Sequence, residues 1–155
     1  MFNTENENKQ ILEKYLKQIS FDSKKPFLLL DADRTLYKDD AGLLMAKELN
    51  LDWDCIKKDF EKYGHTYNGF LTMYKVFSSI STSQCAITSE KISNQIELYD
   101  GVKDFLLKSV NKFNTLIITA GVGEVIKCLC DHNNICSINI IASQYHNQDE
   151  NFLIG

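Results

Sequence analysis

Two aspartates stand at the end of the most apolar stretch of the chain, PFLLLDADRTL (residues 26–36). Side chains two positions apart on a strand point to the same side, so Asp31 and Asp33 converge if the strand beginning at Phe27 persists. Neighbouring carboxylates repel each other, and each loses solvation beside a core strand. A divalent cation that prefers oxygen ligands, such as Mg²⁺, relieves both costs. Without a metal, one carboxyl should hold a proton, which is what a general acid requires.

A threonine ends a second apolar run, NTLIITAGVG (residues 114–123). Thr119 is expected at the carboxyl end of this strand, followed by a turn at Ala120 and Gly121. A hydroxyl and free backbone N–H groups at such a turn can hold an anion. A simpler interpretation is that the aspartates and Thr119 only cap turns. Their combination at two strand ends, the edge where α/β sheets bind ligands, instead favours phosphate chemistry.

The order of predicted elements indicates an α/β protein with a Rossmann-like parallel sheet. The run FLLL (residues 27–30) has no alternation, as in a strand buried on both faces. After residue 98 the pattern predicts a helix capped by Asp100, the strand ending at Thr119, a helix over 124–131 and a third strand, CSINIIAS. Helices alternating with strands imply right-handed parallel crossovers.

A long helical segment separates the first strand from the rest of the predicted sheet. Residues 41–98 carry mostly helical spacing, including a helix predicted to start at Thr88, and they are much longer than an ordinary crossover. We therefore predict an α/β core formed by residues 1–40 and 99–155, with residues 41–98 inserted as a helical cap.

Composition excludes several classes of partner. The formal net charge of −4 argues against a nucleic-acid surface, and no apolar run is long enough to span a membrane. The N-terminus lacks a signal-peptide profile, so the cytoplasm is the default location.

Four potential metal ligands gather in CLCDHNNIC (residues 128–136), but on a helix Cys128 and Cys130 point to nearly opposite sides. Reduced thiols are favoured over a metal there.

The segments LLLDADRTL and LIITAG resemble the first two motifs of the haloacid dehalogenase superfamily. The first motif of that family is Asp-x-Asp-x-Thr/Ser after an apolar strand, and the second is a Thr or Ser that ends the next core strand. LYDGVKDFLL resembles the family's segment leading back from the cap. IIASQYHNQDENFLIG resembles the stretch after strand three in phosphoserine phosphatase and pyrimidine nucleotidase relatives. The insert fits a helical cap placed just after strand one.

The resemblance implies a Mg²⁺-dependent phosphatase acting on a small phosphorylated metabolite. Asp31 would attack phosphorus and become an aspartyl-phosphate, and Asp33 would protonate the leaving oxygen and then deprotonate water. Asp31 and Asp33, the latter through its backbone carbonyl, would contact Mg²⁺. The implied phosphoryl-binding residues are Thr35, Thr119, Ala120 and Gly121. The second acid, Asp33, favours phosphate over carbon–halogen chemistry.

The chain also departs from the family pattern. A lysine after strand three and an acidic motif after strand four would complete the family's site, and neither is found before Gly155. Strand one would then be an apolar sheet edge, so we expect a further segment or a partner to cover it. One alternative is a phosphate-binding regulatory module without turnover. Another is a response-regulator receiver domain, which needs a phosphate acceptor at a strand end between Asp33 and Thr119, and Asp100 is the single candidate for that position.

Overall fold

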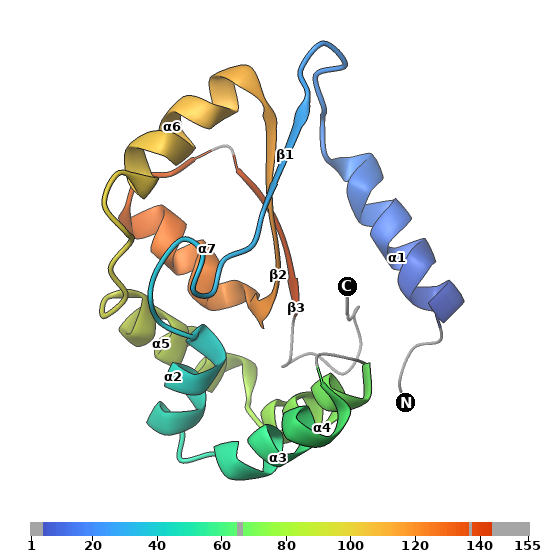
Figure 1. Cartoon of the computed structure of the whole chain (residues 1–155), viewed down its shortest axis with the longest axis vertical. Helices are drawn as coiled ribbons and strands as arrows, with labels where there is room; N and C mark the ends of the chain where they lie inside the picture. Colours follow the sequence, from blue (N-terminus) through green and yellow to red (C-terminus); the bar gives the residue numbers. More distant parts are fainter. Residues whose placement is uncertain (1–4, 65–66, 137, 144–155) are drawn as a thin grey trace.

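The computed structural model describes residues 5–64, 67–136 and 138–143. Three parallel strands form the sheet in the order β1-β2-β3 (Figure 1), and they span Phe27–Leu30, Asn114–Val122 and Asn139–Ser143. The predicted α/β class with a parallel sheet is confirmed. β2 lies in the middle and β1 at an edge of this sheet.

Helices lie on both sides of the sheet. Figure 1 shows α6 and α7 on one side and α1 on the other. The helices of the described chain are α1 (Glu5–Gln18), α2 (Ala41–Glu48), α3 (Trp53–Tyr63), α4 (Tyr67–Phe77), α5 (Thr82–Ser93), α6 (Val102–Lys112) and α7 (Gly123–His132). None of these helices combines the length and the apolar composition needed to cross a membrane.

The two faces of the sheet differ in burial. On the face toward α6 and α7, Ile117 is fully buried and the Thr115 hydroxyl donates to the Ser109 hydroxyl of α6 at 3.0 Å. On the other face, Leu29 is 59% exposed and Ile118 is 38% exposed. The prediction that FLLL is buried on both faces is therefore wrong for the described residues. β1 is an edge strand, and composition alone cannot tell which of its faces another element covers.

Adjacent isoleucines of β2 allow this difference to be measured. Truncating Ile117 to alanine should destabilise the protein by about 2–5 kcal/mol, because a core cavity is left behind. Truncating Ile118, on the open face, should cost roughly half that or less. Urea unfolding of both variants checks the prediction. Equal costs would mean that the Ile118 face is covered in solution.

The helical segment between β1 and α6 contributes to the core along its length. Each of α2, α3, α4 and α5 adds buried residues to the apolar cluster that contains Ile117 of β2, among them Ile56 of α3 and Phe77 of α4. Helices α3 and α4 pack against each other, and the Thr72 hydroxyl donates to the Asp59 carboxylate between them. Figure 1 shows α3 and α4 beyond the carboxyl ends of the strands. The assignment of 41–98 as a cap stays a prediction.

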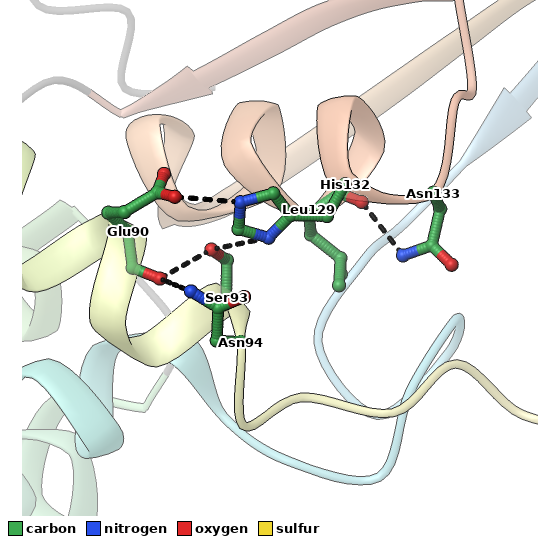
Figure 2. Close-up of polar contacts among 6 residues, drawn as sticks. All are labelled: Glu90, Ser93, Asn94, Leu129, His132 and Asn133. Atoms are coloured by element: carbon green, nitrogen blue, oxygen red, sulfur yellow. Dashed lines mark hydrogen bonds and ion pairs between the residues drawn. The ribbon is translucent and has the colours of Figure 1, made fainter.

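A polar network joins α5 of this segment to α7 of the core (Figure 2). His132 Nε2 lies 2.9 Å from the Glu90 carboxylate, and its Nδ1 lies 3.2 Å from the Ser93 hydroxyl. Asn94 and Asn133 each hydrogen-bond a carbonyl one turn earlier in their own helix, which closes both helix ends beside the imidazole. The network therefore stabilises the packing of the segment's last helix on the core.

Two predicted helix starts are wrong. α5 begins six residues before Thr88, where Ser81 and Gln84 form a reciprocal capping box, and Thr88 is buried within the helix. The residue that caps α6 is Gly101 rather than Asp100, and its φ of 79° is a conformation that glycine adopts without strain. In each case a residue other than the expected one, Ser81 for α5 and Gly101 for α6, caps the helix.

The cysteines are all free thiols. Cys130 is buried and Cys128 partly exposed, as their opposite positions on a helix predict. Burial raises the pKa of Cys130 to about 11, so this thiol stays protonated at neutral pH. Within the described ranges no group of three or more His, Cys, Asp or Glu side chains is arranged to hold a metal ion.

Candidate active site

The chain turns sharply after β1, and this turn separates the two aspartates. β1 ends at Leu30, and the amides of Thr35 and Leu36 both donate to the carbonyl of the fully buried Ala32, at 3.1 and 2.9 Å. The strand does not persist through Asp33 as the sequence pattern suggested. Asp31 is consequently exposed, whereas Asp33 is half-buried.

One oxygen of Asp33 is held by two donors. Its Oδ1 accepts from the Tyr37 hydroxyl at 2.6 Å and from the Ala41 backbone N–H at 2.8 Å. Burial raises the pKa of the Asp33 carboxyl above its ordinary value; these two hydrogen bonds lower it in part, and the charges of Asp40 and Asp31 raise it again. Asp33 therefore holds a proton more readily than an ordinary aspartate does.

Asp31 has a different environment. Its Oδ2 accepts a hydrogen bond from the Thr35 hydroxyl at 3.3 Å, and both side chains are exposed to solvent. An exposed carboxylate is accessible to an incoming molecule. The predicted substrate contact of Thr35 stays a prediction, since in this structure its hydroxyl is directed at Asp31.

The end of β2 completes the site from a second strand. Thr119 is 8% exposed, and its Oγ1 accepts from the Gly121 N–H at 3.0 Å. The prediction that the strand ends at Thr119 in a turn at Ala120 and Gly121 is wrong. β2 continues to Val122, which pairs with β3 after an irregularity between Thr119 and Val122. The Gly121 N–H is thus bonded within the strand rather than free.

Gly121 brings the two strand ends into contact. A Cβ atom added at Gly121 would lie 2.4 Å from Asp33 Oδ2 and 3.2 Å from Thr119 Oγ1. Asp33, Thr119 and Gly121 are therefore direct neighbours, as the sequence predicted from the shared edge of a parallel sheet. The second carboxylate oxygen of Asp33 is directed at this glycine, where a larger residue has no room.

Gly121→Ala should therefore destabilise the protein by about 1–3 kcal/mol, because the new methyl group collides with the Asp33 carboxylate. Denaturant unfolding measures the cost. In a background that already carries Asp33→Ala, the same glycine substitution should cost clearly less, since the colliding oxygen is gone. An identical cost in both backgrounds would contradict the contact between Gly121 and Asp33.

Sequence reasoning missed Tyr37 and Ala41 as neighbours of Asp33. The Ala41 amide could have been anticipated as a hydrogen-bond donor. Asp40 caps α2 by accepting the Leu43 N–H at 3.0 Å, so Ala41 is the first residue of the helix and its N–H has no carbonyl partner within the helix. No sequence signal indicates the Tyr37 contact. It depends on the path of the loop between Asp33 and Asp40, in which Arg34 adopts a φ of 59°.

No protein-family model matches the sequence, and no curated protein matches it either. Solved structures do match the fold. A phosphoserine phosphohydrolase-like protein from Francisella tularensis has a TM-score of 0.58 and 23% identity, with 82% of this chain and 62% of that one covered. A phosphoserine phosphatase, solved as a phospho-aspartyl intermediate analogue, has a TM-score of 0.59 and 13% identity, with 83% and 61% covered.

A cytosolic 5'-nucleotidase IIIB bound to cytidine is also similar, with a TM-score of 0.56, 14% identity, and coverage of 94% of this chain and 56% of that one. The chain thus spans less than two thirds of the length of each of these proteins. At such identities the likeness concerns the fold. The chain thus shares the fold of these three proteins and of a HAD family hydrolase from Salmonella enterica (TM-score 0.57, 15% identity), which is the fold that the resemblance in its sequence implied.

Proposed function

We propose that the protein is a Mg²⁺-dependent phosphatase that hydrolyses a small phosphomonoester through a phosphorylated aspartate. The observation that carries this proposal is the unequal environment of the two carboxylates. Asp31 is exposed and bound by one hydroxyl, whereas Asp33 is half-buried and bound by two donors. Two acids whose surroundings separate their proton affinities can divide the roles of nucleophile and acid–base catalyst.

Asp31 is the proposed nucleophile. One of its carboxylate oxygens forms a bond to phosphorus as the bond between phosphorus and the ester oxygen breaks, which leaves an aspartyl-phosphate and an alcohol. Its exposure supports this role, because a phosphate group can approach the carboxylate. The Thr35 hydroxyl, bonded to Oδ2, restricts the rotation of the carboxylate.

Asp33 is the proposed general acid and base. Protonated, it gives its proton to the departing ester oxygen; deprotonated, it takes a proton from the water that attacks the aspartyl-phosphate. These two transfers restore the starting protonation state of the enzyme. The raised pKa of Asp33 supports the first transfer, since the carboxyl more readily carries a proton.

The residues at this site fit a magnesium ion. The side chains of Asp31, Asp33 and Thr35 offer oxygen atoms only, the ligand type that Mg²⁺ prefers. The Asp31 carboxylate and the Asp33 backbone carbonyl would hold the ion, since Oδ1 of Asp33 is already engaged by two donors. A bound Mg²⁺ supplies positive charge that offsets repulsion between the phosphate and the carboxylates.

Thr119 and Ala120 are the proposed phosphoryl-binding residues at the end of β2, together with Thr35 beside Asp31. Gly121, whose N–H is bonded to Thr119 Oγ1, would bind the phosphoryl group only if that hydrogen bond is exchanged for one to the phosphate. Helices α3 and α4 lie beyond the carboxyl ends of the strands (Figure 1). They are proposed to contact the part of the substrate other than its phosphate group and so to determine substrate specificity. The names of the similar structures suggest phosphoserine and nucleoside monophosphates as the first substrates to test.

The test is release of inorganic phosphate from phosphoserine, nucleoside monophosphates and 4-nitrophenyl phosphate by the purified full chain. We expect release to require Mg²⁺, to stop when EDTA is added and to return with excess Mg²⁺. No release from any of these esters, with Mg²⁺ saturating, would contradict the proposal.

A phosphate-binding module without turnover is the second candidate. It is favoured by one observation: within residues 5–64, 67–136 and 138–143, no ion pair joins Asp31 or Asp33 to a lysine. This candidate would be supported if the protein binds inorganic phosphate but hydrolyses none of the esters named above. A receiver domain is disfavoured, because that fold places its first strand between the second and the third, whereas here β2 is central.

A further inference from the structure

Tyr37 makes the closest hydrogen bond to Asp33. Its side chain is fully buried, and its hydroxyl lies 2.6 Å from Asp33 Oδ1, a distance typical of a hydroxyl donating to a charged oxygen. The tyrosine hydroxyl is the donor in this bond, and the Asp33 oxygen accepts.

A second donor binds the same oxygen from another element. The backbone N–H of Ala41, the first residue of α2, points at Oδ1 from 2.8 Å. Two donors on one oxygen prevent the carboxylate from turning over, because a rotated group would lose both bonds at once. The other oxygen, Oδ2, consequently stays directed at Gly121 and the end of β2.

We propose that Tyr37 is a positioning residue, which holds Oδ1 of Asp33 so that Oδ2 is the oxygen that gives and receives the catalytic proton. This inference rests on the function proposed above. Tyr37 does not touch substrate; it acts through Asp33. The positioned oxygen faces Thr119 and Gly121, where the phosphoryl group is proposed to bind.

The location of Tyr37 in the chain adds a second consequence. Its backbone forms a bridge with Leu98, and the carbonyl of Leu36 accepts the Tyr99 N–H at 3.0 Å. Tyr37 therefore lies where the chain leaves the core for residues 41–98 and where it returns. The two ends of the inserted segment therefore meet at Tyr37, the residue that hydrogen-bonds Asp33. Both the inserted segment and the acid–base group are thus in contact with Tyr37.

The test compares Tyr37→Phe with Tyr99→Phe, a matched control that removes a hydroxyl from a side chain 45% exposed. The measured quantity is kcat/KM, which reports phosphoryl transfer to Asp31. An alkyl phosphate needs a proton on its leaving oxygen, whereas 4-nitrophenolate departs without one. For Tyr37→Phe we expect about a tenfold loss with the alkyl ester and less than about twofold with 4-nitrophenyl phosphate. Tyr99→Phe should match the wild type.

A merely structural role for Tyr37 would lower kcat/KM for both esters alike, and that result would overturn the proposal, as would no loss for either. Thermal unfolding of Tyr37→Phe within a few degrees of the wild type establishes that the variant is folded.

A measurement independent of activity keeps this inference separate from the proposed function. In proton NMR spectra of the wild type at low temperature, the buried Tyr37 hydroxyl should give a slowly exchanging downfield resonance. It should vanish in Tyr37→Phe and move in Asp33→Ala. If no ester is hydrolysed, the proposed function fails while this resonance can still establish the contact. Absence of the resonance in the wild type would overturn the positioning of Asp33.

Discussion

Replacing Asp31 with asparagine should reduce phosphate release by at least about 10³-fold, because the amide cannot form the bond to phosphorus. The side chain is exposed and makes a single hydrogen bond at 3.3 Å, so the free energy of unfolding should change by less than about 0.5 kcal/mol. Large loss of activity with unchanged stability indicates a residue that acts on the substrate rather than on the fold. Steady-state phosphate release and urea unfolding measure the two quantities.

Asp100→Asn is the matched control for this substitution. Asp100 is exposed in the turn before α6 and is the residue that a receiver domain would phosphorylate. Its substitution should leave phosphate release unchanged. Undiminished release by Asp31→Asn would remove Asp31 as the nucleophile. Phosphorylation that depends on Asp100 instead would revive the receiver interpretation.

Replacing Asp33 with asparagine should lower turnover by about 10²–10⁴-fold, the usual contribution of a general acid or base. The amide oxygen of asparagine can still accept from Tyr37 and Ala41, so the local structure should persist. What is lost is the proton exchanged at the position of Oδ2. This variant therefore separates proton transfer from the architecture of the loop.

The stage at which Asp33→Asn stalls distinguishes its role further. With 4-nitrophenyl phosphate, transfer to Asp31 needs no protonated leaving group, but hydrolysis of the aspartyl-phosphate needs a base. We expect a burst of 4-nitrophenolate followed by slow turnover, and a protein whose intact mass after acid quenching includes one phosphoryl group. Unchanged turnover, with no phosphorylated protein, would contradict the role of Asp33.

The sequence alone determined the general plan of the protein. The apolar runs that become β1, β2 and β3 and the helices between them are local patterns, and the alternation of such strands with helices leaves few arrangements other than a parallel sheet. The meeting of Asp33 with Thr119 and Gly121 follows from the same plan, because the carboxyl ends of parallel strands share one edge.

Only the tertiary structure decided how each site residue is oriented and buried. Nothing local in the sequence shows which of Asp31 and Asp33 is buried; the turn around Ala32 leaves Asp31 exposed and places Asp33 between Tyr37 and Ala41. Likewise, FLLL is as apolar as a buried strand, yet its burial depends on which elements pack on it. Apolar periodicity is a property of neighbours along the chain, whereas burial and hydrogen bonding depend on residues that only folding brings together.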